Sequence, residues 1–208
     1  LNVPHLRALG LGRVAHLGGE SDPCTGAFGR MAEASAGKDS ITGHWELMGV
    51  VVERPFPVFG GGFPQDAIDR LSAATGRQII GNAAFSGMSV IEALGEQHLH
   101  TGALIVYTSA DSVCQIAAHD SVLSPAELYR VCETAFEIFC RGLGVARVIA
   151  RPFIGVPGSF VRTSQRRDFA LPPPETTLFD RLSATGKPVV GIGKVDDLFG
   201  GRGLSRAV

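Results

Sequence analysis

The sequence predicts an α/β fold, and three observations support this prediction. Segments with the apolar spacing of helices alternate with short β-rich segments along most of the chain. The chain contains 27 glycines and 12 prolines, which are spread out and indicate many short elements joined by tight turns. Hydrophobic residues make up 45% of its 208 residues, which is enough for a globular core and too many for a disordered chain.

Charge and hydropathy exclude several classes of protein. Nineteen basic and twenty acidic residues give a net charge of −1, so we expect no nucleic-acid partner and no membrane association. Apolar runs such as 103–106 are far shorter than the ~20 residues of a membrane span. Residues 1–17 lack the pattern of a secretory signal, and we expect a cytoplasmic protein. Because the first residue is Leu1, we expect a removed leader or a chain that begins inside a longer protein.

The cysteines indicate packing rather than chemistry. The four of them show neither a C-x-x-C pair nor zinc-type spacing. Cys132 and Cys140 occur in an apolar, helix-like stretch, where a thiol packs as a small hydrophobe. We therefore expect buried free thiols rather than a disulfide.

Two linkers divide the chain into three parts. Residues 55–64 contain three prolines and three consecutive glycines, and residues 172–174 are three consecutive prolines. The segment between them reads as a compact unit, and the flanking segments are expected to belong together. The expected domains are 1–54, 55–172 and 173–208.

Each part has its own predicted elements. Before the first linker we expect a helix over 4–11 and a loop over 18–38 with one helical turn at 30–34. Gly76 and Gly186 are expected to end helices, and a capping box with proline at Ser124-Pro125-Ala126-Glu127 is expected to begin one. The predicted later elements are, in order, helix 65–75, strand 78–80, helix 89–100, strand 103–109, helical residues 116–119, helix 125–141, strand 145–153, helix 176–185 and buried strand 188–193.

The first candidate site is the polar segment GKDSITGHWE at residues 37–46. A hydroxyl there, flanked by Asp39 and His44, could be a nucleophile or a metal ligand, since a serine hydroxyl needs a base or a metal for activation. The alternative is a loop in which Ser40 or Thr42 caps a helix and Asp39 is solvated. The segment is not a P-loop, because the required glycine pattern around Lys38 is missing.

The second candidate site is a basic cluster. Arg147 and Arg151 are four residues apart on a predicted strand, so their side chains are expected on the same face. Arg162, Arg166 and Arg167 follow a glycine-bearing loop. Guanidinium groups bind phosphate bidentately, so a phosphate site and a solvated basic face with one or two aspartates are about equally supported.

The third candidate site lies at the end of strand 103–109. Ser109 and Asp111 could accept hydrogen bonds from sugar hydroxyls while the arginines bind a phosphate, and an ordinary helix cap is the alternative. The pair His98 and His100 is not expected to bind metal, because positions i and i+2 of a helix point apart. We expect His119 to be an ordinary core or surface histidine of a helix.

These segments together resemble phosphopentomutases, the bacterial type in the alkaline phosphatase superfamily. GKDSITGHWE resembles the family's nucleophile loop, and TGALIVYTSADSVCQIAAH, RVIARPFIG and the FVRTSQRRDFAL region match further along in family order. The resemblance implies an alkaline-phosphatase-like α/β core with an inserted α/β cap domain at 55–172. It implies exchange of α-(deoxy)ribose 1-phosphate and (deoxy)ribose 5-phosphate through a phosphorylated hydroxyl residue, primed by glucose 1,6-bisphosphate or ribose 1,5-bisphosphate.

The resemblance also assigns roles to particular residues. The catalytic nucleophile falls on Ser40, where the family usually has threonine. Asp111 falls on a sugar-contacting carboxylate with Ser109 beside it, and Arg147 falls on a phosphate-contacting arginine with Arg151 and Arg162 nearby. Residues 82–88 depart from the family pattern, which has a lysine and a Thr-Glu pair there.

The family's two manganese ions imply ligands that this sequence lacks. A metal-binding aspartate is expected before Leu1 and a D-H-G motif after Val208, so the chain reads as the middle of such an enzyme and no metal ligand set is assigned within it. The alternatives to a phosphopentomutase are a module that binds a sugar phosphate without turnover and a structural fragment without a ligand. The oligomeric state is open.

Overall fold

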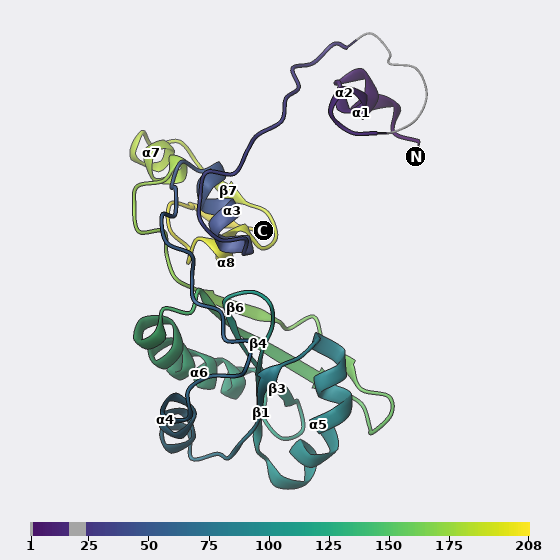
Figure 1. Cartoon of the computed structure of the whole chain (residues 1–208), viewed down its shortest axis with the longest axis vertical. Coiled ribbons are helices and arrows are strands. Elements are labelled where there is room, and N and C mark those ends of the chain that lie inside the picture. The colour runs from purple at the N-terminus through teal and green to yellow at the C-terminus, as the bar shows by residue number, and fades with distance from the viewer. Residues whose placement is uncertain (1, 17–23) are drawn as a thin grey trace. The chain divides into compact units, whose positions relative to one another are not determined.

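The computed structural model describes residues 2–16 and 24–208 (Figure 1). The chain divides into two compact units, Leu1–Ala34 and Ser35–Val208. The first unit contains two short helices, α1 (Pro4–Ala8) and α2 (Leu11–Val14). The expected helical turn at 30–34 is wrong, because the described chain has no helix there.

The second unit is built on a six-stranded mixed sheet. Its strand order is β1-β2-β3-β4-β5, and β6 also pairs with β4. The β1–β2 and β3–β4 pairs are parallel, whereas β2–β3, β4–β5 and β4–β6 are antiparallel. The strands are β1 (Ile79–Ala84), β2 (Leu104–Thr108), β3 (Val113–His119), β4 (Arg147–Ile154), β5 (Val161–Arg162) and β6 (Arg167–Ala170).

Helices and a small second sheet complete this unit. The second sheet is the parallel pair β7 (Val190–Gly191) and β8 (Arg206–Ala207). The helices are α3 (Ser40–Leu47), α4 (Gln65–Thr75), α5 (Gly87–Thr101), α6 (Pro125–Ala135), its π-helical continuation η1 (Phe136–Arg141), α7 (Leu178–Ala184) and α8 (Val195–Leu198).

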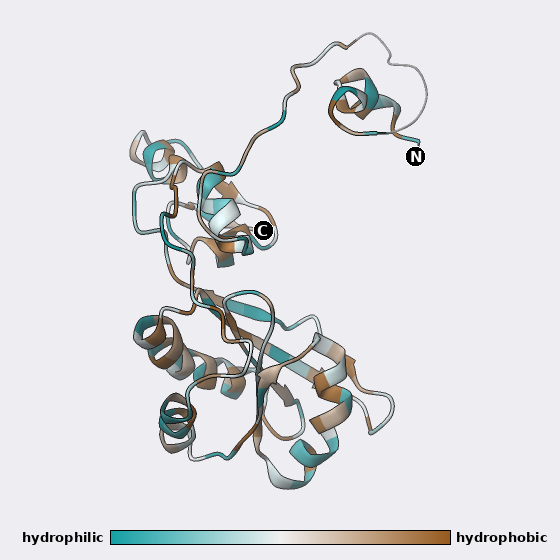
Figure 2. Ribbon diagram, viewed as in Figure 1, coloured by the Kyte–Doolittle hydropathy of each residue, from teal (hydrophilic) through white to brown (hydrophobic). Residues whose placement is uncertain are grey.

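Helices cover both faces of the six-stranded sheet (Figure 1). On one face, α4, α6 and η1 pack against residues such as Val106 and Ile116, and the apolar sides of these helices face the strands (Figure 2). On the other face, α5 packs against a cluster that includes Tyr107 and Phe153. Because β2 and β3 are buried on both faces, their side chains are apolar in succession rather than in alternation.

A third hydrophobic cluster holds α3 in place. Ile41 and Trp45 of α3 pack with Ala146, which precedes β4, and with Phe199, which follows α8. The indole N–H of Trp45 also donates to the carbonyl of Leu198 at 3.0 Å. The beginning of β4 and the beginning of α3 therefore lie close together.

Most of the predicted elements are confirmed, including the helix at 65–75 and the capping box at Ser124. The helical prediction for 116–119 is wrong, because these residues end β3. A short apolar run buried on both faces has the same pattern in a helix and in a strand, so the sequence alone did not distinguish them.

The prediction of a buried strand at 188–193 is also wrong in part. Only Val190–Gly191 forms a strand, and it pairs with β8. Val190 is 51% exposed and Ile192 is 77% exposed. The apolar composition of this segment indicated burial, but an apolar side chain can remain exposed when a small sheet covers only one side of it.

The expectation of buried thiols is confirmed. Cys114, Cys132 and Cys140 are buried and form no disulfide within the described residues. Burial raises the pKa of each of these thiols, so they remain protonated. Within the described ranges, the structure also contains no helix long and apolar enough to cross a membrane.

Candidate anion-binding site

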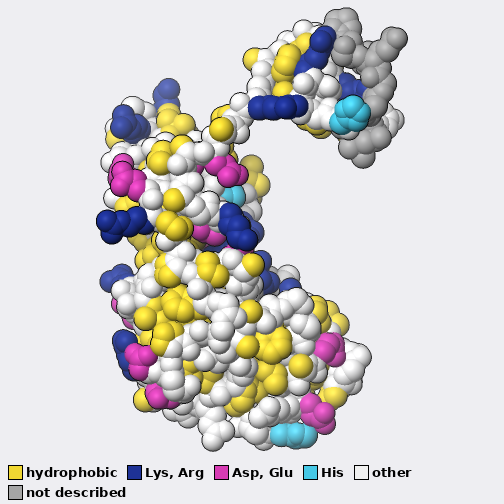
Figure 3. Space-filling view, viewed as in Figure 1, with side chains coloured by type: hydrophobic (Ala, Val, Ile, Leu, Met, Phe, Trp, Pro, Cys, Tyr) yellow, Lys and Arg dark blue, Asp and Glu magenta, His cyan; other side chains and the backbone are white. Residues whose placement is uncertain are grey.

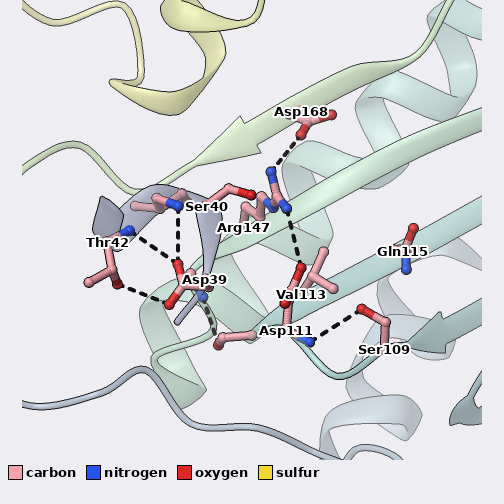
Figure 4. A network of polar contacts seen from close by, with 12 residues as sticks. Asp39, Ser40, Thr42, Ser109, Asp111, Val113, Gln115, Arg147 and Asp168 are labelled. Carbon is pink, nitrogen blue, oxygen red and sulfur yellow. Dashed lines mark hydrogen bonds and ion pairs between the residues drawn. The ribbon is translucent and has the colours of Figure 1, made fainter. Parts of the chain in front are cut away.

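The first turn of α3 is fixed by Asp39. The Asp39 carboxylate accepts the backbone N–H groups of Ile41 and Thr42 at 3.2 and 3.3 Å, and the Thr42 hydroxyl donates to it at 2.9 Å (Figure 4). Asp39 is only 9% exposed, so the alternative of a solvated Asp39 is wrong. Asp39, rather than Ser40 or Thr42, is the helix cap.

Ser40 is the first residue of α3 and is exposed to solvent. Its carbonyl accepts a hydrogen bond from His44 Nδ1 at 2.6 Å, one helical turn further along. The N-terminus of a helix carries partial positive charge and favours a negative group. At α3 the Asp39 carboxylate is that negative group, since it accepts the N–H groups of Ile41 and Thr42.

Arg147, the first residue of β4, lies between two carboxylates (Figure 4). Its Nη1 donates to Asp168 Oδ2 at 3.1 Å, and its Nη2 lies 3.9 Å from Asp111 Oδ2. The Arg147 side chain is 7% exposed, whereas that of Asp111 is 40% exposed. Since Ile41 packs with Ala146, Ser40 and Arg147 lie in the same part of the molecule, as Figure 4 shows.

Arg151 occupies the same face of β4 as Arg147, as the strand period predicts. Its Nε and Nη2 both donate to Gln115 Oε1, at 3.1 and 2.9 Å. Burial lowers the pKa of Arg151, and the charge of Arg166 lowers it further. The Arg151 guanidinium is thus held by the neutral amide of Gln115. This contact does not neutralise the positive charge of Arg151.

Arg162 and Tyr107 carry polar atoms that lack partners among the described residues. Arg162 Nε and the Tyr107 hydroxyl oxygen are buried, and neither forms a hydrogen bond with any of the described residues. The Arg162 guanidinium lies against Gly87, where a Cβ would overlap it. Burial raises the pKa of Tyr107, which keeps its hydroxyl protonated. Buried unsatisfied groups of this kind are uncommon in folded proteins.

The loop between β2 and β3 carries the predicted sugar-contacting residues. The backbone N–H of Asp111 donates to Ser109 Oγ at 3.4 Å, which shapes the loop (Figure 4). Asp111 faces Arg147 at 3.9 Å, too far for a hydrogen bond. Its carboxylate therefore retains acceptor capacity for a ligand.

Two charged residues of this cluster, Asp168 and Lys194, were not singled out from the sequence. Asp168 accepts hydrogen bonds from Arg166 Nε and Nη2, each at 2.6 Å. Burial lowers the pKa of Lys194, and the positive charges of Arg166, Arg147 and Arg151 lower it further. Lys194 follows the predicted strand 188–193, a position where ligand-binding residues are common, and that signal could have identified it.

The site combines these cations into a region suited to a phosphate ester. Figure 3 shows that basic and acidic side chains are otherwise interspersed on the visible face, in keeping with the net charge of −1. Arg151 lies close enough to Arg166 and Arg162 for their charges to lower its pKa. Neighbouring guanidinium groups of this kind favour binding of phosphate.

A cavity beside β6 adjoins this cluster. It has a volume of about 380 Å³, and its charged lining residues are Glu133, Glu137, Arg167, Asp168, Asp196 and Asp197. Burial raises the pKa of Asp197, and repulsion from Asp168 and Asp196 adds to this. Carboxyl groups outnumber the single arginine in this lining, which disfavours an anion there.

His98 has a structural role at the sheet. His98 is buried, and its Nε2 accepts the backbone N–H of His119 at 2.8 Å while its Nδ1 faces the carbonyl of Ala103. Across the described residues, no group of three His, Cys, Asp or Glu side chains is placed to hold a metal ion. The residues described here therefore do not fit a metal centre by themselves.

The fold and this cluster define an α/β protein with a polar, arginine-rich site where the sheet meets α3. The α/β class predicted from the sequence is confirmed, and the comparisons with known proteins name one activity. The chain is 51% identical over 208 residues to the phosphopentomutase of Dictyoglomus turgidum, covering 99% of this chain and 52% of that protein. It is 51% identical to that of Dictyoglomus thermophilum, with 99% and 53% covered, and 49% identical to that of Caldanaerobacter subterraneus, with 100% and 53% covered.

The chain is thus related to phosphopentomutases along essentially its whole length, which confirms the resemblance drawn from the sequence. Their similarity also fits the expected alkaline-phosphatase-like α/β class. The chain spans about half the length of the curated relatives it matches. No protein-family model matches it.

Proposed function

We propose that this chain binds a pentose phosphate and carries the phosphoryl-accepting residue of a phosphopentomutase. That enzyme interconverts α-(deoxy)ribose 1-phosphate and (deoxy)ribose 5-phosphate. The observation that carries the proposal is the position of Arg147, which lies beside Asp111 and at the same end of the sheet as Ser40. The relatives named phosphopentomutase support it.

The binding roles follow from charge and hydrogen-bonding capacity. We assign phosphate binding to Arg147 and Arg151, which lie on one face of β4, and to Arg162, which pairs with Phe153 further along that strand. Asp111 accepts hydrogen bonds from the sugar hydroxyls, and Ser109 orders the loop or contacts the sugar. Ribose without a phosphate group is therefore expected to bind much more weakly than ribose 5-phosphate, because the arginines contact the phosphate.

Ser40 accepts the phosphoryl group. A sugar bisphosphate, glucose 1,6-bisphosphate or ribose 1,5-bisphosphate, loses one phosphoryl group as its P–O bond breaks and a bond from phosphorus to Ser40 Oγ forms. The hydroxyl proton of Ser40 ends on the departing sugar oxygen.

The metal requirement is a further part of the proposal. The family resemblance implies two manganese ions, which offset phosphoryl charge in reactions of this type. The described residues offer Ser40 but no group of three ligating side chains around it. We therefore attribute no step to a metal within these residues. That observation favours a second candidate function, a module that binds the sugar phosphate without turnover.

The same proposal covers organisation and location. Residues 55–172 act as a cap domain, and residues 1–54 and 173–208 belong to the core domain of the enzyme. The substrates are small pentose phosphates, and the protein acts in the cytoplasm without nucleic-acid or membrane partners. The metal is manganese and the protein is transiently phosphorylated.

Intact-mass measurement before and after addition of Mn²⁺ and glucose 1,6-bisphosphate tests the enzymatic role. We expect a gain of one phosphoryl group, mapped to Ser40 and abolished by Ser40→Ala. Ser89→Ala is the matched control, because Ser89 is also an exposed serine in the first turn of a helix. A mass that never changes would leave the chain as a binding module and contradict the phosphoryl-accepting role.

A further inference from the structure

Asp168 is a buried carboxylate that has no role in the proposed function. It lies on β6 opposite Ile149 of β4, so its side chain is on the face of the sheet that carries Arg147 and Arg151. Its side chain is 0% exposed, although it is a carboxylate. Carboxylates are almost never fully buried unless they are paired.

The pairing of Asp168 is unusually complete. Oδ1 accepts Arg166 Nε at 2.6 Å, and Oδ2 accepts both Arg166 Nη2 at 2.6 Å and Arg147 Nη1 at 3.1 Å. One carboxylate thus fixes two guanidinium groups, one of them by a bidentate pair. The hydrogen bond to Asp168 raises the pKa of Arg166.

These contacts leave part of each guanidinium outside the pairing. Arg166 uses Nε and Nη2 for Asp168, so its Nη1 hydrogens are outside the bidentate pair. Arg147 uses Nη1, and its Nη2 is directed toward Asp111. Without a shared anion, two guanidinium groups this close repel each other and spread over several rotamers.

Asp168 also lies beside the neighbouring helix α8. Its backbone N–H lowers the pKa of Asp197, and the two residues line the same cavity. Lys194, at the beginning of α8, is influenced electrostatically by Asp168 and by both arginines. Asp168 is therefore at the point where the cations of β4, the loop before β6 and the start of α8 meet.

We propose that Asp168 is a positioning residue for the phosphate of the pentose phosphate. It holds Arg147 and Arg166 in one relative orientation, so that both bind the same phosphate group, and Arg166 becomes a further binding residue. This inference rests on the proposed function, because it requires that Arg147 contacts the phosphate.

A comparison of two anions distinguishes positioning from simple charge neutralisation. Asp168→Asn keeps the shape of the side chain but removes its charge, which raises the local positive charge and loosens both guanidinium groups. We expect titration calorimetry to show about tenfold weaker binding of ribose 5-phosphate. Binding of inorganic phosphate, which fits many orientations, is expected to stay unchanged or to strengthen.

Asp180→Asn is the matched control for stability. Asp180 also pairs with an arginine, Arg202, at 3.1 Å, and it caps α7 away from the site. We expect this variant to melt earlier but to bind ribose 5-phosphate normally at a temperature where it is folded. Equal loss of ribose 5-phosphate binding in both variants, in proportion to melting temperature, would overturn the positioning role.

Arg166→Lys keeps the test decisive if Asp168→Asn does not fold. Lysine retains the charge but cannot form the bidentate pair. We expect weaker binding of ribose 5-phosphate with unchanged binding of inorganic phosphate. Unchanged binding of both anions in either variant would reject the inference while leaving the proposed function intact. Failure of the unsubstituted chain to bind ribose 5-phosphate would reject the proposed function, and the inference with it.

Discussion

Arg147 connects two carboxylates that differ in burial, and this difference defines its role. Asp168 is fully buried and positions the guanidinium, whereas Asp111 is partly exposed and forms a longer ion pair of 3.9 Å with it. We expect Arg147→Ala to weaken ribose 5-phosphate binding by about tenfold or more in calorimetry, since a charge-assisted contact is lost. Arg141→Ala is the control, because Arg141 is 67% exposed, pairs with Glu137 and lies over the Phe136 ring on the helix surface. Equal affinities of the two variants would contradict the assignment.

The Tyr107 hydroxyl is buried and has no hydrogen-bond partner among the described residues. We expect Tyr107→Phe, without ligand, to raise the free energy of unfolding by about 1 kcal/mol, because an unsatisfied polar atom is removed. Urea unfolding measures this change. Tyr129→Phe is the comparison, because the Tyr129 hydroxyl donates to the carbonyl of Gln165 at 2.8 Å. A loss of stability in Tyr107→Phe would show that its hydroxyl has a partner in solution.

At the level of single residues, the sequence predicted part of the site. The shared face of Arg147 and Arg151 follows from the period of a strand, and the structure confirms it. The role of Asp168 was not predictable, because it depends on the register between β4 and β6, which no local pattern determines. The capping role of Asp39 was missed because Ser40 and Thr42 are equally good caps by residue type.

At the level of elements, α3 depends on its cap. Asp39 accepts two backbone N–H groups and the Thr42 hydroxyl, so Asp39→Ala is expected to lower the free energy of unfolding by about 1 kcal/mol. Asp39→Asn retains an acceptor at the same position and is expected to lose much less. Chemical denaturation of the two variants tests this ranking. Equal stability of Asp39→Ala and the unsubstituted chain would contradict it.

The elements also show where sequence patterns are informative. The helix at 65–75 and the one that begins after Ser124 were predictable, because spacing and capping residues agree. The strand β3 and the small β7–β8 sheet were not, because their apolar runs carry no period that separates strand from helix or buried from exposed. The meeting of α3 with the beginning of β4 depends on the long-range cluster of Ile41, Trp45 and Ala146.

At the level of the whole molecule, His98 links α5 to the sheet and makes stability dependent on pH. Burial lowers the pKa of His98 below its ordinary value of 6.5. The unfolded chain therefore takes up a proton at a higher pH than the folded chain does, so the stabilising contribution is present above 6.5 and is lost as the pH falls through the lower, folded-state pKa. We expect the melting temperature to decrease between about pH 7 and about pH 5.

The matched variants for this pH dependence are His98→Gln and His100→Gln. His100 is exposed on the same helix and is expected to leave the slope of melting temperature against pH unchanged. His98→Gln cannot take up a proton, so the slope is expected to flatten even if overall stability falls. An unchanged slope in His98→Gln would assign the pH dependence to other groups.

Titration of the 208-residue chain with ribose 5-phosphate measures the proposed binding of a pentose phosphate. We expect saturable binding that weakens as salt concentration rises, because the ligand is held mainly by arginine charges. Ribose without phosphate, titrated under the same conditions, is expected to give no measurable binding. Absence of ribose 5-phosphate binding, or equal binding of ribose, would contradict the proposal that the arginines of this chain bind a pentose phosphate.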